Sequence, residues 1–125
     1  MKPGRIMVVD DDESIRESLP DLLMSFGFSV RPFSSAEEFL DSGSADQADC
    51  LVLDVAMPGM SGPELQEELA RLNYRIPIVF ITAHADETIW ERVLASGATS
   101  CLVKPFSETS IIDAVSTAMG PQQGY

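Results

Sequence analysis

Three short apolar runs along the chain contain no alternating polar positions: residues 6–9, 51–53 and 76–81. Strands that are buried on both faces have this pattern, so the three runs predict the central strands of a parallel sheet. Weaker runs over 28–30 and 100–103 predict two further strands.

Between these runs, apolar residues recur at the spacing of a helix. One predicted helix over 15–26, stopped by Gly27, carries its apolar face on five residues: Ile15, Leu19, Leu22, Leu23 and Phe26. The missing N–H of Pro20 predicts a kink in this helix. Similar spacing predicts helices over 65–72 and 111–119, the latter opened by Ser107 as N-cap. Two shorter helices are expected around 36–40 and 86–95.

Five alternating strand–helix pairs predict an α/β fold, a single-domain doubly wound (βα)5 parallel sheet with helices on both faces. The chain has 125 residues, enough for one core and too few for two. We expect the domain to span residues 1–119. Residues 120–125 have no packing pattern and are expected to form a disordered tail or the start of a linker.

The informative polar residues follow the predicted strands. Strand one ends in Asp10-Asp11-Asp12, and later strands end in Asp54, Thr82 and Lys104. In an open parallel sheet the carboxyl ends of the strands form one ligand-binding rim. Two carboxylates about 4 Å apart repel by about 4 kcal/mol at an effective dielectric near 20, so the acids need a cation to converge. Oxygen-only ligands suit Mg²⁺.

With Mg²⁺ bound, one carboxylate can attack phosphorus and form an aspartyl phosphate. Lys104 would neutralise the transferred group, and the Thr82 hydroxyl could donate a hydrogen bond to it. The alternative is that these residues are helix caps and solvated loop residues. That alternative is reasonable for any one of them and poor for the whole set.

The charge of the chain limits its partners. Twenty acidic residues against eight basic ones give a net charge of -12, which disfavours direct contact with nucleic acid or an anionic membrane. No apolar stretch approaches the roughly 20 residues of a membrane span, and the first residues do not resemble a signal peptide, so we expect a soluble cytoplasmic protein. Cys50 and Cys101 lie in apolar runs and are expected to be two buried, reduced thiols.

Four motifs in this order resemble the receiver family of response regulators: Val9-Asp10-Asp11-Asp12, 53–62 (LDVAMPGMSG), Ile81-Thr82-Ala83 and Val103-Lys104-Pro105-Phe106. The resemblance covers about residues 5–119. Within the family the chain is most similar to the FixJ-like branch, through 36–40 (AEEFL) and 59–62 (GMSG). The resemblance implies a flavodoxin-like sheet with strand order 2-1-3-4-5.

The resemblance also implies roles for single residues. Asp54 would be the phospho-acceptor. Asp11, Asp54 and the main-chain carbonyl of Ala56 would bind Mg²⁺, with Asp10 assisting through water. The phosphodonor would be a phosphohistidine on a sensor histidine kinase. Such a domain catalyses its own phosphorylation and slow dephosphorylation, so it is a switch and not a turnover enzyme.

Other implied residues would hold the transferred group. Thr82 and the backbone amide of Ala83 would bind phosphoryl oxygens, and Lys104 would form a salt bridge to them, with a cis bond to Pro105. The output would be transcription, through a DNA-binding domain absent from this chain. A stand-alone regulator is equally compatible with the sequence.

Three positions depart from the family pattern or bear on it. Cys101 stands where the family usually has an aromatic switch residue, so Trp90 or Phe106 would substitute, backbone shifts would suffice, or the cysteine has no consequence. Ala56 has no polar group to place water, which favours a longer-lived phosphoryl group. His84 lies either on the rim of the site or on a surface loop.

The predicted helix 86–95 carries two adjacent apolar stripes: Ile89/Val93 and Trp90/Leu94. Burial of both is the simpler expectation. The alternative leaves Trp90 partly exposed beside the last strand, as an anchor for a partner. We predict phosphorylation-dependent homodimerisation through this face, which includes the Cys101 region.

Three other functions are alternatives to that of a phospho-acceptor receiver. A haloacid-dehalogenase-type phosphatase would use Asp10 and Asp12, but Ser14 does not fit that family, no late acidic pair follows, and the chain is too short for a cap. A pseudo-receiver would act through protein contacts without phosphorylation. A flavodoxin-like FMN binder needs a Ser/Thr/Gly-rich loop after the first strand, which the three aspartates exclude.

Overall fold

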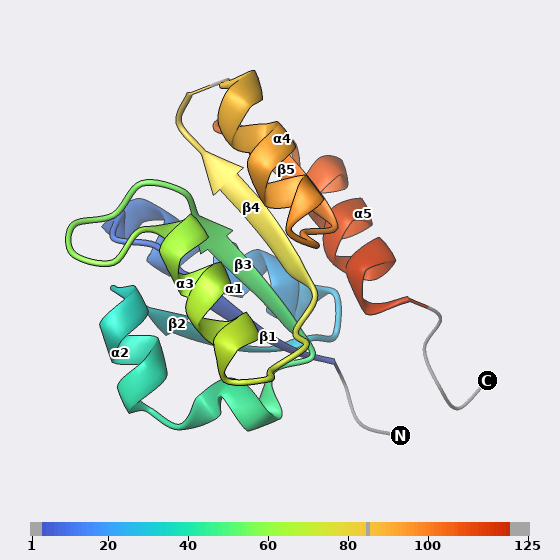
Figure 1. The fold of residues 1–125 in the computed structure, drawn as a ribbon. Coiled ribbons are helices and arrows are strands. Elements are labelled where there is room, and N and C mark those ends of the chain that lie inside the picture. Colours follow the sequence, from blue (N-terminus) through green and yellow to red (C-terminus); the bar gives the residue numbers. More distant parts are fainter. Residues whose placement is uncertain (1–3, 85, 121–125) are drawn as a thin grey trace.

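A five-stranded parallel sheet forms the centre of the molecule (Figure 1). The computed structural model describes residues 4–84 and 86–120. Its strands are β1 (Arg5–Val9), β2 (Ser29–Phe33), β3 (Cys50–Asp54), β4 (Ile78–Thr82) and β5 (Ser100–Val103). They pair in the order β2-β1-β3-β4-β5, all parallel, which confirms the doubly wound α/β fold.

Five helices connect and cover the strands: α1 (Glu13–Ser25), α2 (Ala36–Asp41), α3 (Gly62–Arg71), α4 (Glu87–Ala95) and α5 (Glu108–Met119). Helices α1 and α5 pack on one face of the sheet, and α2, α3 and α4 pack on the other (Figure 1). A short 3-10 helix, η1 (Ser44–Gln47), was not expected from the sequence. Ser107 caps α5 as predicted, because its side chain accepts a hydrogen bond from the Ser110 amide.

The central strands are buried on both faces, as their unbroken apolar runs predicted. All residues of β3 and β4 are buried, and so is β1 after Arg5. Side chains on one face of the sheet pack with Phe39 of α2 and Leu65 of α3, and those on the other with Leu23 of α1 and Ile111 of α5. This frame fixes the carboxyl ends of β1, β3 and β4.

The edge strands differ more from the sequence-based expectation. Strand β2 continues to Phe33 through Pro32, which an edge strand tolerates because one side of it needs no N–H donor. All of β5 is only partly buried, so Cys101 is half-exposed and only Cys50 fits the prediction of a buried thiol. Burial raises the pKa of Cys50 to about 12 and of Cys101 to about 11.

The end of α1 corrects the predicted apolar face. Leu19 and Leu23 are buried, but Phe26 is 56% exposed. The helix ends at Ser25, and Phe26 is its C-cap, so the side chain no longer follows the helical stripe. Gly27, with φ +96°, turns the chain so that the Phe28 amide donates to the carbonyl of Leu23. The helix runs without interruption through Pro20.

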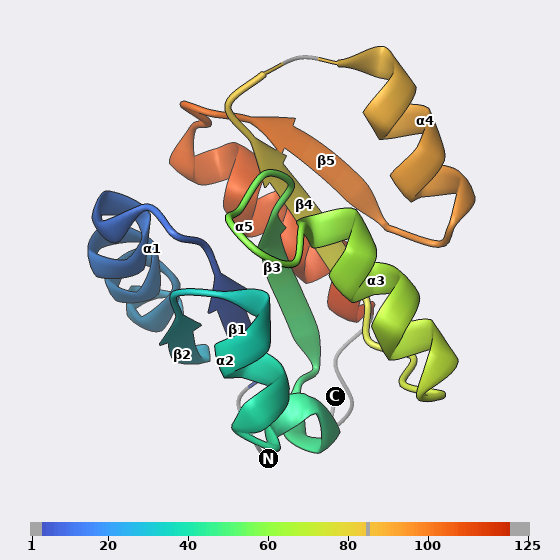
Figure 2. The same cartoon turned by 60° about the vertical axis from the view of Figure 1, so that its left-hand side comes forward.

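The two stripes of α4 are not both buried, contrary to the simpler expectation. Val93 is fully buried, Ile89 and Trp90 are half-buried, and Leu94 is 43% exposed. The helix lies beside the edge strand β5, so only its inner side finds cover on the sheet (Figure 2). Within the described residues, no helix is both long and apolar enough to cross a membrane.

Candidate functional site

The carboxyl ends of four strands bring together the polar residues predicted from the sequence. Asp10 directly follows β1, Asp54 and Thr82 end β3 and β4, and Lys104 follows β5. Asp10, Asp54 and Thr82 are buried, at 0%, 5% and 6% exposure. Groups this polar are rarely buried without partners, so their surroundings decide their chemistry.

Three of the predicted acids form one cluster, which we call the acid cluster: Asp10, Asp11 and Asp54. One carboxylate oxygen of each lies within 4.8 Å of the other two. Asp12 does not join them. Its carboxylate caps α1 by accepting a hydrogen bond from the Ser14 amide at 2.9 Å, so the helix-cap alternative holds for this residue. An acid–x–acid pair of Asp10 and Asp12 is therefore not assembled.

Lys104 supplies the positive charge of the site. Its Nζ lies 2.8 Å from Asp10 Oδ2 and 3.8 Å from Asp54 Oδ1. The Lys104 amide donates to the carbonyl of Thr82 at 2.7 Å, which fixes the start of the loop after β5. The Lys104–Pro105 peptide bond is cis, as the resemblance implied. Burial alone would lower the pKa of Lys104, but the hydrogen bond and charge of Asp10 outweigh it and raise the pKa.

The ammonium group does not balance the acid cluster. Burial, followed by repulsion from Asp10, raises the pKa of Asp54 from 3.8 to about 7, and the attraction of Lys104 only partly offsets this. Three carboxylates thus face one ammonium group at the rim. An additional cation would relieve the repulsion that raises the pKa.

The acid cluster fits a magnesium ion by donor chemistry and spacing. All its donors are carboxylate oxygens, the ligands that hard divalent cations prefer. Oxygens on opposite sides of Mg²⁺ lie about 4.2 Å apart, given bond lengths near 2.1 Å, so the observed spacing needs little adjustment.

The loop of residues 55–61, here called the β3–α3 loop, curls over the end of β3 (Figure 2). The Val55 amide donates to the carbonyl of Ile81, and the Val55 carbonyl accepts from the amide of Gly62 at 2.9 Å. A side chain at Gly62 would collide with the Asp54 carbonyl, so α3 starts close against the end of β3. Ala56 is exposed, and its carbonyl accepts no hydrogen bond from the described residues.

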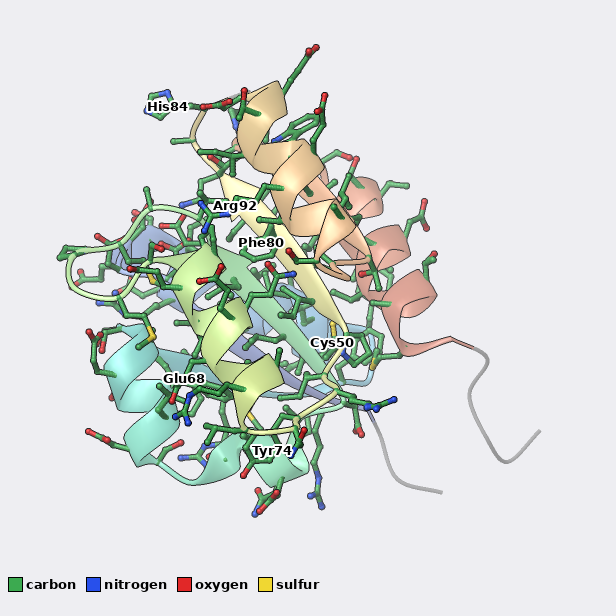
Figure 3. All side chains as sticks on the ribbon, in the orientation of Figure 1. Cys50, Glu68, Tyr74, Phe80, His84 and Arg92 are labelled. Atoms are coloured by element: carbon green, nitrogen blue, oxygen red, sulfur yellow. The ribbon has the colours of Figure 1, made fainter. Side chains whose placement is uncertain are left out.

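Thr82 faces its own loop. Its hydroxyl donates to the carbonyl of His84 at 3.1 Å and accepts from the His84 amide at 3.2 Å. The amide of Ala83 donates to none of the described groups. The His84 imidazole is exposed and points away from the domain (Figure 3), so the surface-loop alternative is correct for the side chain.

Sequence reasoning missed one contact of the rim. Arg16 of α1 donates from Nη1 to the main-chain carbonyl of Asp10 at 3.0 Å. This hydrogen bond ties the first turn of α1 to Asp10, the residue that follows β1. Its only signal in the sequence is a basic residue about one turn into a helix, which is too common to be informative.

Comparisons with known proteins agree with this geometry. The family model described as "Response regulator receiver domain" matches residues 6–116. Nodulation protein W of Bradyrhizobium diazoefficiens is 49% identical over 113 residues, which are 90% of this chain and 50% of that protein. Transcriptional regulatory protein FixJ of Azorhizobium caulinodans is 40% identical over 115 residues, covering 92% of this chain and 54% of FixJ. The chain thus spans about half the length of these relatives.

Solved structures give the same result. The response regulator StyR superposes with a TM-score of 0.87 at 49% identity, over 95% of this chain and 60% of StyR. The structure titled FixJ-N superposes with a TM-score of 0.86 at 36% identity and covers both chains completely. The chain belongs to the response regulator receiver domain family.

Proposed function

We propose that this domain is a phospho-acceptor switch in which Asp54 takes a phosphoryl group from a phosphohistidine of a sensor histidine kinase. The observation that carries the proposal is the meeting of the acid cluster with Lys104 at the carboxyl ends of the strands. The carboxylates and the ammonium group that the proposed transfer would use lie together at this rim. The domain would promote its own phosphorylation and slow dephosphorylation, and would not turn over a separate substrate.

The acid cluster and the Ala56 carbonyl are the groups that would hold Mg²⁺, and Asp10 would act through a bound water. When bound, the cation neutralises the carboxylates and polarises the phosphoryl oxygens. It would also favour the ionised, nucleophilic form of Asp54, whose pKa burial and Asp10 otherwise raise to about 7.

In the transfer, an Asp54 carboxylate oxygen forms a bond to phosphorus while the phosphorus–nitrogen bond of the phosphohistidine breaks. The electron pair of the broken bond stays on the imidazole nitrogen. Lys104, already 3.8 Å from Asp54 Oδ1, would pair with the added charge. The Thr82 hydroxyl would leave His84 to donate to a phosphoryl oxygen, and the Ala83 amide, which donates to no described group, would donate to another.

We further propose that the domain regulates transcription as part of a longer cytoplasmic protein. The chain covers about half of relatives whose names describe transcriptional regulatory proteins. Its net charge of -12 makes the receiver itself a poor ligand for DNA. A separate domain would therefore make the DNA contact.

The α4–β5 face, defined here by Trp90, Leu94 and Cys101, is the proposed contact between two phosphorylated copies. Trp90 and Cys101 are half-buried and Leu94 is exposed, so the face offers apolar area at the sheet edge. The buried indole N–H of Trp90 has no hydrogen-bond partner among the described residues. Phosphorylation would promote dimerisation by rearranging the neighbouring end of β4.

The central experiment incubates the purified domain with acetyl phosphate and MgCl2 and measures intact mass. We expect the mass to rise by one phosphoryl group in wild type, and neither in Asp54→Asn nor when EDTA replaces MgCl2. A folded wild-type sample that gains no mass would favour the pseudo-receiver. Peptide mapping that finds the phosphoryl group on Asp10 would favour the phosphatase.

A further inference from the structure

The β3–α3 loop has very few hydrogen bonds of its own. Its four residues Ala56–Gly59 make no hydrogen bond with any described group. The loop is anchored where it starts, by the bond between Val55 and Gly62, and by Met57, whose side chain is 8% exposed. The Ala56 carbonyl lies in this loosely bonded stretch, so its direction depends on what holds the far end of the loop.

Two carboxylates hold that far end. The Ser61 amide donates to Oε1 of Glu64 in α3 at 2.8 Å, and the preceding residue is held from α2. Glu37 of α2 accepts a hydrogen bond from the Met60 amide on Oε2, at 2.9 Å. The neighbouring Gly59 has φ +75°, and a Cβ added to it would lie 2.6 Å from the same oxygen. Glycine thus allows both the turn and the close approach of the carboxylate.

The helix that carries Glu37 is itself fixed to the core. Phe39 is fully buried, and its ring packs edge-on against Phe33 of β2 with centroids 5.3 Å apart. Ser35 caps the helix by accepting from the Glu38 amide at 3.0 Å. Glu37 therefore connects the β3–α3 loop, which has few hydrogen bonds, to a helix that is packed on the core. The two bonded residues are 23 positions apart in the sequence.

We propose that Glu37 is a positioning residue for the metal site: through the Met60 amide, its carboxylate holds the β3–α3 loop so that the Ala56 carbonyl faces the acid cluster. The inference rests on the proposed phospho-acceptor function, which supplies the need for that carbonyl. Glu37 itself touches neither metal nor phosphoryl group. Hydrogen bonds to a charged acceptor are strong enough to select one conformation of a loop that has few other hydrogen bonds.

The test compares three variants with wild type by titrating MgCl2 in a calorimeter. Glu37→Ala removes the acceptor and should weaken Mg²⁺ binding by about three- to tenfold, the worth of one such hydrogen bond. Glu37→Gln keeps an acceptor oxygen and should bind within about twofold of wild type. The matched control is Glu38→Ala, which removes the same charge from the same helical turn but breaks bonds to Ser34 instead.

Glu38→Ala should bind Mg²⁺ within about twofold of wild type, although it removes bonds at the start of α2. Equal weakening in Glu37→Ala and Glu38→Ala would overturn the proposal, since charge or helix stability would then explain it. Equal weakening in Glu37→Ala and Glu37→Gln would also overturn it. Unchanged binding in Glu37→Ala, with wild type still binding Mg²⁺ and accepting phosphate, would overturn this inference and leave the proposed function standing.

A second measurement does not depend on the metal. Amide hydrogen exchange in EDTA should show faster exchange at Met60 in Glu37→Ala and wild-type exchange in Glu38→Ala. Wild-type exchange at Met60 in Glu37→Ala would show that the bond does not hold the loop. If wild type itself neither binds Mg²⁺ nor accepts phosphate, the proposed function fails, whatever the exchange result.

Discussion

The rim of the site and the α4–β5 face lie on the same sheet but are built in opposite ways. At the rim, Asp10, Asp54 and Thr82 are at most 6% exposed, and their polar groups meet other polar groups. On the α4–β5 face, Leu94 is 43% exposed, and the buried indole N–H of Trp90 finds no partner among the described residues. One region concentrates charge in a rigid frame, and the other leaves apolar area uncovered.

The difference shows how a switch divides its tasks. A reacting group must be held in a fixed position, and Asp10, Asp54 and Thr82 lie at the ends of the central strands β1, β3 and β4. The proposed contact face lies instead at the edge strand β5, which is only partly buried and therefore has more freedom to rearrange. Substitutions at the rim should therefore change stability strongly, and substitutions on the face should change association instead.

The largest effect is expected from Lys104→Met, which keeps most of the stem and removes the ammonium group. Asp10 is fully buried, and its Oδ2 would lose the cation 2.8 Å away. We expect the free energy of unfolding without metal to fall by about 3 kcal/mol, as for other broken buried ion pairs. Urea denaturation in EDTA at neutral pH measures it.

A double variant tests whether the uncompensated charge of Asp10 causes this loss of stability. Adding Asp10→Asn to Lys104→Met removes the uncompensated charge, so the double variant should recover most of the lost stability. Lys104→Met as stable as wild type, or a double variant less stable than Lys104→Met, would mean that the rim does not depend on this ion pair.

The next effect is stabilisation by Mg²⁺. A ligand that binds only the folded state at about 100 times its Kd adds about 2.7 kcal/mol, and wild type should gain this amount. Asp11→Asn should lose most of the gain, because Asp11 belongs to the acid cluster. Asp12→Asn is the matched control and should keep the gain, because asparagine caps a helix as well as aspartate does. If both variants lose the same amount of Mg²⁺-dependent stabilisation, the assignment of Asp11 to the metal and of Asp12 to the helix cap is wrong.

This difference between Asp11 and Asp12 shows what the sequence predicts and what it does not. The unbroken apolar runs of β1, β3 and β4 identified the buried strands, and with them the rim where Asp54 and Lys104 meet. The pattern of apolar and polar residues does not separate Asp11 from Asp12, because a helix cap and a metal ligand use the same side chain, and only the resemblance to the receiver family assigned the metal to Asp11. That separation depends on where α1 begins.

Contacts made by isolated side chains were also beyond sequence reasoning. The bond from Met60 to Glu37 joins a backbone amide to an exposed carboxylate 23 residues away, and no periodicity marks it. The exposure of Phe26 and Leu94 depends on where a helix ends and on how far the sheet extends. Periodicity describes the inside of an element better than its borders.

A smaller effect is expected from Asp54→Asn in metal-free protein. Burial and Asp10 raise the pKa of Asp54 above its unfolded value, so the folded protein binds an extra proton between about pH 4 and pH 7. The free energy of unfolding of wild type therefore falls as pH rises through this window. At pH 8 the variant should be more stable by about 1–2 kcal/mol, after discounting the shift for solvent screening at the rim.

The advantage of Asp54→Asn should fade as pH falls and vanish near pH 4, where Asp54 is protonated in both folded and unfolded wild type. Urea denaturation in EDTA at several pH values follows this difference. A variant less stable than wild type at pH 8 would show that Asp54 is stabilised, not strained, by its surroundings.

The smallest change in stability is expected from Leu94→Ser on the α4–β5 face. Because the side chain is 43% exposed, the free energy of unfolding should stay within about 0.5 kcal/mol of wild type. The matched control is Leu72→Ser, since Leu72 is 42% exposed as the C-cap of α3 and is not one of the residues that define this face. If phosphorylated copies associate through the α4–β5 face, only Leu94→Ser loses buried apolar area on association.

Sedimentation after treatment with acetyl phosphate and MgCl2 separates the two variants. Leu94→Ser should dimerise about five- to tenfold more weakly than wild type, corresponding to about 1–1.4 kcal/mol of lost burial, while Leu72→Ser should match wild type. Equal dimerisation by both variants would move the contact to another surface. If wild type accepts a phosphoryl group yet stays monomeric, the proposed dimer contact is wrong. The proposed role of Asp54 would still stand, because its chemistry does not require the edge strand to be covered by a second copy.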